Sequence, residues 1–187
     1  MGDAHWQLLG QSAVPPAATV LEIGAGTGNL LLKIKRAVPG ATVIGLDSDA
    51  AALAVAAAKA ARLGIELHLD HGDAAQLPYP DETFDRILSA FVLHHLPEDQ
   101  QLVMLQEVGR ILKPRGSLHL LDFTFARNRP PSAPVAVEPS RRSRRSGRPT
   151  QTGQTLALLK QAGLLDCAQV GQGRSRLGRH AFYRATR

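Results

Sequence analysis

The sequence of 187 residues is poor in cysteine and in long apolar runs. Its single cysteine, Cys167, excludes an internal disulfide and a zinc or iron–sulfur site made of several cysteines of one chain, and no metal is expected. A bilayer-spanning helix needs about 18 or more consecutive apolar residues, and no such run occurs. The N-terminus carries Asp3 and no basic cluster ahead of an apolar stretch. This pattern is untypical of a signal peptide and favours the cytoplasm.

Acidic residues are almost absent from the last third of the chain. Residues 1–126 carry nine Lys and Arg against fourteen Asp and Glu, whereas residues 127–187 carry thirteen against two. The net charge of +6 therefore arises in the last third. A basic segment can bind phosphates, but one without interleaved aromatic residues is more typical of a solvated surface.

Strand-like and helix-like patterns alternate over residues 19–126. Strands are predicted at 19–23, 41–46, 65–69, 83–89 and 117–122. Helices are predicted between them at 30–38, from Ser48 or Asp49 to Gly64, and from Pro97 to Leu112. Such alternation predicts an α/β fold with a mostly parallel sheet.

We expect one domain over residues 1–187. Residues 127–150, with five prolines and seven arginines, have no apolar period and are predicted to form a basic loop. Residues 151–187 are predicted to form a helix and a strand pair. Ahead of the first strand, Trp6, Leu8 and Leu9 are expected to form at most a short cap.

A glycine-rich turn follows the first predicted strand and precedes the first predicted helix. Gly24, Gly26 and Gly28 let the backbone turn sharply and let a ligand approach it closely. A dinucleotide fingerprint spaces its glycines as G-x-G-x-x-G, whereas here Asn29 stands where the third glycine is expected. A phosphate-binding P-loop would need Gly-Lys-Ser/Thr, which is absent. The glycine spacing therefore disfavours a nicotinamide dehydrogenase, and the missing motif disfavours a P-loop.

Acidic side chains follow the next two strands. Asp47 ends the second strand, where its carboxylate can accept hydrogen bonds from both hydroxyls of a ribose. Asp73 follows the third strand and can accept from an adenine amino group, while the N–H of Ala74 donates to the ring. Glu22, near the end of the first strand, can orient the loop or a ligand ammonium, or serve only as a structural hydrogen-bonding group.

With these residues the sequence resembles the class I S-adenosylmethionine (SAM) dependent methyltransferases. It is most similar to the small-molecule branch that includes the ubiquinone/menaquinone-type, methyltransferase domain 11-like enzymes. The resemblance covers five stretches in the family's order and spacing: 20–30, 43–49, 72–85, 87–97 and 112–122. It implies a Rossmann-like three-layer sandwich with a mostly parallel seven-stranded sheet, whose last strand is antiparallel. It also implies SAM as cofactor and S-adenosylhomocysteine as product.

The resemblance assigns roles to the residues named above. It places the methionine end of SAM on the glycine loop, the ribose on Asp47, the adenine on Asp73 and Ala74, and the ammonium near the Ala90 carbonyl. Ser48 is polar where the family often has an apolar contact to the adenine. The expected cofactor-binding set is Glu22, Gly24, Ala25, Gly26, Gly28, Asn29, Asp47, Ser48, Asp73, Ala74 and Ala90.

The acceptor side offers two candidate bases, His94 and His95, which follow the fourth strand. Methyl transfer from a sulfonium is an in-line displacement, so a base is needed only for a weakly acidic hydroxyl or an ammonium. An ordinary histidine pKa near 6.5 suits that role. The alternative is that both rings only line or shape the loop. We expect a small-molecule acceptor. One alternative is that the protein methylates or binds a nucleic acid, which the arginines at 141–145 would hold. Another is that it is a non-catalytic module that binds SAM.

Overall fold

The computed structural model describes residues 2–124, 152–175 and 178–187. Its seven strands form one sheet in the order β3-β2-β1-β4-β5-β7-β6. The elements are α1 (Gly2–Ser12), β1 (Thr19–Ile23), α2 (Asn29–Ala37), β2 (Thr42–Asp47), α3 (Ala50–Arg62), β3 (His68–His71), β4 (Phe84–Ala90), the 3-10 turn η1 (Leu93–His95), α4 (Glu98–Ile111), β5 (Leu112–Phe123), α5 (Thr152–Gln161), β6 (Leu165–Ser175) and β7 (Gly178–Thr186).

Only the last strand runs against the others. Strands β1 to β5 pair in parallel, and β7 lies antiparallel between β5 and β6. From β1 the chain builds outward through β2 and β3, and then returns to the other side of β1 with β4. In such a sheet, ligands bind at the carboxyl ends of the two strands where the order reverses, here β1 and β4. The predicted fold class is confirmed.

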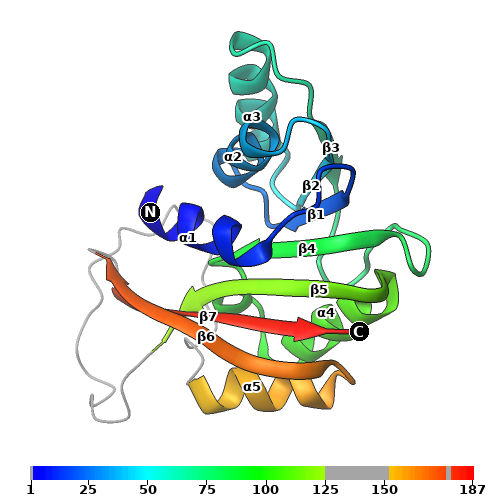
Figure 1. Cartoon of the computed structure of the whole chain (residues 1–187), viewed down its shortest axis with the longest axis vertical. Helices are drawn as coiled ribbons and strands as arrows, with labels where there is room; N and C mark the ends of the chain where they lie inside the picture. The colour runs from blue at the N-terminus through cyan, green and yellow to red at the C-terminus, as the bar shows by residue number, and fades with distance from the viewer. Residues whose placement is uncertain (1, 125–151, 176–177) are drawn as a thin grey trace.

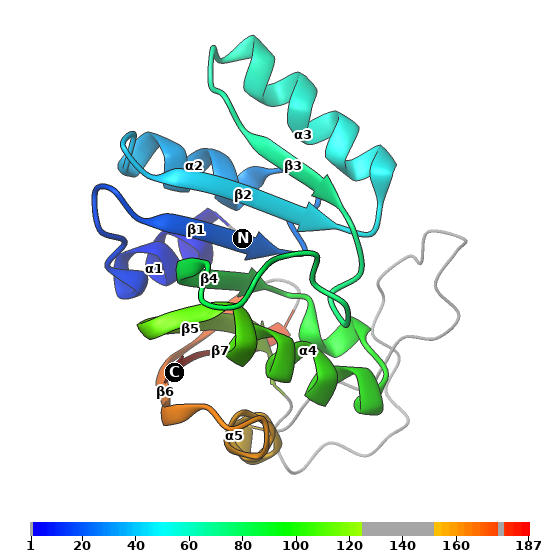
Figure 2. The same cartoon turned by 90° about the vertical axis from the view of Figure 1, so that its right-hand side faces the viewer.

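Helices cover both faces of the sheet, as the two views show (Figures 1 and 2). On one face, α1, α2 and α3 pack against residues such as Val20, Leu88 and Phe182. On the other face, α4 and α5 pack against Leu21, Ile87 and other strand residues that alternate with the first set. Because both faces are buried, the central strands are almost continuously apolar, as expected for a parallel sheet between helix layers.

Most predicted elements are found within a few residues of their expected limits, and three differ. The N-terminal segment forms a helix of 11 residues rather than a short cap. Strand β3 lies about three residues later than predicted. Strand β5 begins at Leu112, directly after α4, so the chain continues through Lys113 and Pro114 as strand. The predicted loop at 127–150 lies outside the described residues.

Asp49 rather than Ser48 begins α3. Its side chain accepts hydrogen bonds from the backbone N–H groups of Ala51 and Ala52. Among the described helices, none combines the length and apolar character needed to cross a bilayer. The described residues also contain no cluster of three or more His, Cys, Asp or Glu side chains arranged to hold a metal.

Candidate functional site

The glycine loop turns from β1 into α2 through three residues with positive φ. Gly24, Gly26 and Gly28 have φ angles of 74°, 51° and 75°. A Cβ at Gly24 would lie 2.1 Å from a methyl carbon of Val92, and one at Gly28 would lie 2.8 Å from the Cβ of Ala56. A Cβ at Gly26 would meet nothing within 4 Å. Two of the glycines therefore allow close packing, whereas Gly26 faces open space.

Hydrogen bonds join the glycine loop to the end of β2. The backbone N–H groups of Gly24 and Ala25 both donate to the carbonyl of Leu46, at 2.8 and 3.0 Å. The N–H of Gly26 donates to Oδ2 of Asp47 at 2.6 Å, and Asp49 N–H donates to Oδ1 at 2.8 Å. A carboxylate has about four acceptor positions. Asp47 therefore holds the loop in shape and keeps capacity for two further donors.

The predicted adenine-binding residues lie beside Asp47. The N–H of Gly72 donates to the Asp47 carbonyl at 3.1 Å, so Asp73 follows at the neighbouring strand end. Asp73 is exposed, and its Oδ1 accepts from the Ala75 N–H at 2.8 Å. Ala74 packs against the core beneath. The side chain of Ser48 is exposed, and its carbonyl contacts His71 Nε2 at 3.1 Å.

Lys59 of α3 supports the loop from the opposite side. Its ammonium donates to the carbonyl and hydroxyl oxygens of Thr27, both at 2.9 Å, and to Oδ1 of Asn29 at 3.0 Å. Lys59 is not predictable from the sequence, because it lies 30 residues from Asn29 in an alanine-rich helix. Its regular helical position gave no signal of this contact.

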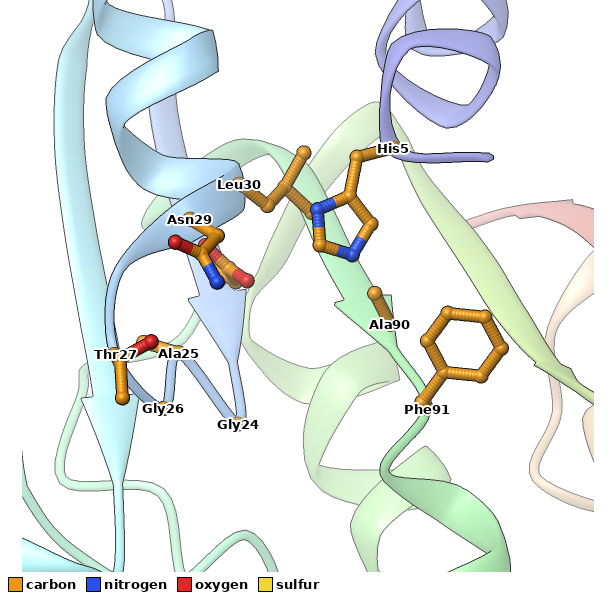
Figure 3. A pocket seen from close by; sticks show the side chains of 10 residues that line it. His5, Gly24, Ala25, Gly26, Thr27, Asn29, Leu30, Ala90 and Phe91 are labelled. Atoms are coloured by element: carbon orange, nitrogen blue, oxygen red, sulfur yellow. The ribbon is translucent and has the colours of Figure 1, made fainter. Parts of the chain in front are cut away.

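A cavity of about 170 Å³ lies between the glycine loop, the start of α2, the end of β4 and helix α1 (Figure 3). Six of the predicted cofactor-binding residues line it: Glu22, Gly24, Ala25, Gly26, Asn29 and Ala90. The other five lie outside its lining: Gly28 in the loop beneath, and Asp47, Ser48, Asp73 and Ala74 at the ends of β2 and β3.

Glu22 is the buried acid of the cavity. Its side chain is 3% exposed, and its Oε2 has no hydrogen-bond partner within the described part of the chain. Burial raises its pKa well above the usual value; the N–H of Leu31 opposes this shift and Asp47 adds to it. A buried carboxyl with a free oxygen can accept a donor that enters the cavity.

His5 of α1 also lines the cavity, and it is not among the residues predicted from the sequence. Its ring points from α1 toward Ala90 and lies beside Phe91, with ring centroids 6.4 Å apart (Figure 3). Its pKa is lowered to about 4, first by burial and next by the charge of Lys33. A lone histidine near the start of the chain gave no sequence signal, because its placement depends on how α1 docks.

His94 pairs with a buried aspartate. Its Nδ1 lies 2.6 Å from Oδ1 of Asp122, and its backbone N–H donates to Oδ2 at 3.0 Å. Asp122, at the end of β5, is fully buried, and its Oδ1 also accepts from the N–H of Phe123 at 2.7 Å. Because a carboxylate only accepts, it holds the proton of the imidazole on Nδ1 and leaves the Nε2 lone pair available.

His95 has a different environment. Its ring lies against that of His94, with centroids 3.9 Å apart and the ring planes tilted by 40°. Burial of part of the ring, and then the neighbouring His94, lower its pKa. It is more exposed than His94 and takes no part in the bond to Asp122. Within residues 2–124, 152–175 and 178–187, His94 has a partner that fixes its tautomer and His95 has none.

A doubly wound sheet with a glycine loop, a cavity at the reversal point and acids at neighbouring strand ends defines a nucleoside-cofactor-binding α/β domain. A family model described as a methyltransferase domain matches residues 20–116, just over half of the sequence. The chain belongs to this family. This match confirms SAM, the cofactor predicted from the sequence.

Curated relatives match the same part of the chain. The demethylmenaquinone methyltransferase of Thermus thermophilus is 38% identical over 104 residues, which cover 56% of this chain and 46% of that protein. The enzyme of the same name from Tropheryma whipplei is 36% identical over 131 residues, covering 67% of this chain and 51% of that protein. The chain thus spans about half the length of the curated relatives that it matches.

Solved structures share the fold. The YcgJ protein of Bacillus subtilis superposes with a TM-score of 0.80 at 17% identity, over 100% of this chain and 99% of that one. The [4+2]-cyclase SpnF superposes with a TM-score of 0.82 at 20% identity, over 100% of this chain and 80% of that one. Likeness at such identities shows the fold alone, and SpnF is named for a cyclisation rather than a methylation.

The residues of the cavity fit SAM. The unpaired Oε2 of Glu22 suits an ammonium, and the open space above Gly26 leaves room beside the loop backbone. Ligand pockets usually measure about 300–1,000 Å³. A cavity of about 170 Å³ therefore has room for only one end of SAM, and the rest would lie over Asp47 and Asp73.

Proposed function

We propose that this chain transfers a methyl group from SAM to a small-molecule acceptor by in-line displacement, with His94 taking the acceptor's proton. When bound, SAM supplies a methyl group activated by its sulfonium. The chain's own part is to hold both reactants in line and to remove the proton. Alignment alone can lower the barrier of such a reaction by about 7–11 kcal/mol.

The cofactor side of the proposal uses the predicted residues. The glycine loop and Glu22 would hold the methionine end, Asp47 the ribose, and Asp73 with Ala74 the adenine. Support comes from the free acceptor capacity of Asp47 and from the position of Asp73 at the next strand end. We expect Asp47→Ala to abolish binding of S-adenosylhomocysteine while the domain stays folded. Unchanged affinity in calorimetric titration would refute the ribose assignment.

The bond between His94 and Asp122 is the observation that carries the catalytic part. His94 follows β4, whose end adjoins the cavity through Ala90 and Phe91, and Asp122 lies near the end of β5, the strand that pairs with β4. A buried carboxylate that orients a histidine also stabilises the imidazolium formed when the ring accepts a proton. The proposed acceptor therefore carries a proton on its attacking atom, as a hydroxyl or an ammonium does.

The test combines acceptor screening with two histidine variants. Release of S-adenosylhomocysteine from SAM is followed with panels of small hydroxylated and amine metabolites, and with RNA and DNA fragments. Once an acceptor is found, His94→Asn is expected to lower kcat by about 10²–10⁴, the usual contribution of a positioned base. His95→Asn serves as the matched control and is expected to retain most of the activity.

Two results would contradict the proposal. Equal losses in both histidine variants would show that the loop shape matters rather than a base. Turnover with nucleic acid alone would favour the alternative acceptor, whose arginines at 141–145 lie outside the described residues.

A further inference from the structure

Two residues that line the cavity carry a buried polar atom with no hydrogen-bond partner in the described part of the chain. Nδ1 of His5 and Oε2 of Glu22 are both buried and accept or donate no hydrogen bond among the described residues. His5 comes from α1, and Glu22 comes from the middle of the sheet. Buried polar groups are nearly always paired, so two in one cavity point to a ligand that pairs with both.

Glu22 and His5 differ in the charges around them. Glu22 is an acid whose other hydrogen bond comes from the N–H of Leu31. His5 lies near the cation Lys33 of α2, which disfavours a positive charge on the ring. The Glu22 side therefore suits a cation and the His5 side suits an anion. An α-amino acid group, with an ammonium and a carboxylate on one carbon, carries both charges at short separation.

We propose that His5 binds the carboxylate of the amino-acid end of the cofactor, while Glu22 takes its ammonium. A neutral imidazole donates one N–H to the carboxylate, and its tautomer is free to adjust because Nδ1 has no partner among the described residues. Helix α1 is then part of the cofactor site and not only a cover of the sheet. This inference rests on the cofactor assigned above, and it adds a binding residue outside the matched region 20–116.

The competing explanation is that His5 only packs against its neighbours and binds no ligand. Its ring lies beside Phe91, and a phenyl group would fill the same space. His5→Phe keeps that packing and removes the N–H, so it separates the two roles. Trp6→Ala is the matched control, because Trp6 is the next residue of α1 and is 50% exposed, with its ring over the ammonium of Lys33.

The experiment is a ligand-truncation cycle by titration calorimetry. S-adenosylhomocysteine carries the amino-acid end, and 5′-methylthioadenosine lacks it. We expect His5→Phe to weaken S-adenosylhomocysteine about tenfold, equivalent to about 1.4 kcal/mol, and to leave 5′-methylthioadenosine unchanged. Trp6→Ala should change neither affinity. Thermal melting of each variant confirms that it is folded.

Three other results would contradict the assignment of His5 to the cofactor carboxylate. An unchanged affinity of His5→Phe for S-adenosylhomocysteine would assign His5 to packing. Equal weakening of both ligands would assign it to the docking of α1. If the unmodified protein binds neither ligand, the cofactor assignment itself fails, which is distinct from a failure confined to the His5 variant.

Discussion

Replacing Gly26 with alanine should separate the stability of the glycine loop from its function. Gly26 has a φ of 51°, and a Cβ there would meet no atom within 4 Å. The structural cost is therefore the left-handed backbone alone, about 1–2 kcal/mol for a residue with a Cβ. In a domain of this size that corresponds to a fall in melting temperature of about 2–8 °C. The added methyl group occupies the space that we assign to the cofactor, so binding should be lost.

Two other glycines supply matched comparisons. Gly64 has a φ of 63° and open space around its Cβ position, but it follows α3 away from the cavity. Gly64→Ala should lower the melting temperature as much as Gly26→Ala and leave binding intact. Gly28→Ala adds a contact at 2.8 Å with the Cβ of Ala56, so overpacking of about 1–3 kcal/mol adds to the backbone strain.

The assay is thermal melting with and without S-adenosylhomocysteine. At a ligand concentration 100 times Kd, binding stabilises a protein by about 2.7 kcal/mol, which raises the melting temperature of such a domain by about 5–11 °C. The unmodified protein and Gly64→Ala should show this rise, and Gly26→Ala should show none. A full rise in Gly26→Ala would refute the placement of the cofactor. A much larger loss of stability than in Gly64→Ala would refute the view that the position is open.

Three further changes test the supports around the site. Lys59→Met should weaken S-adenosylhomocysteine several-fold in titration, because Thr27 and Asn29 lose a shared donor; an unchanged affinity would contradict this. Asp49→Ala should lower the free energy of unfolding in urea by about 1 kcal/mol through loss of the α3 cap, with cofactor affinity preserved, and a neutral result would count against the cap. A hydrogen bond from Arg110 lowers the pKa of Glu107 in the folded protein. The ion pair therefore stabilises the fold above the ordinary carboxyl pKa, and this stabilisation is lost as the pH falls through the lowered pKa of Glu107. Glu107→Gln should therefore cost about 0.5–1 kcal/mol at pH 7 and nothing at low pH, and a pH-independent difference would refute the ion pair.

The sequence predicts the fold well where the signals are local. The strand, glycine turn and helix from β1 to α2 follow from neighbouring residues, and so does the α3 cap, for which the sequence offered Ser48 or Asp49. Prediction failed where tertiary contacts decide. Lys113 and Pro114 indicate a break, but pairing of Phe84 with Leu112 begins β5 ahead of them. The segment around Trp6 forms a full helix because Leu8 and Leu9 are buried against the sheet.

The same contrast divides the site itself. The cofactor side is predictable because one loop and two strand ends carry it, and each signal lies within a few residues of a glycine or an acid. The proposed acceptor side and the contacts of helix α1 depend on pairs far apart in the chain. His94 and Asp122 are separated by 28 positions, and His5 meets Phe91 across 86. No spacing rule links such residues, because the order of β4 and β5 and the docking of α1 bring them together. A family match over residues 20–116 therefore identifies the cofactor, whereas His5 and Asp122 lie outside the match, one beyond each end.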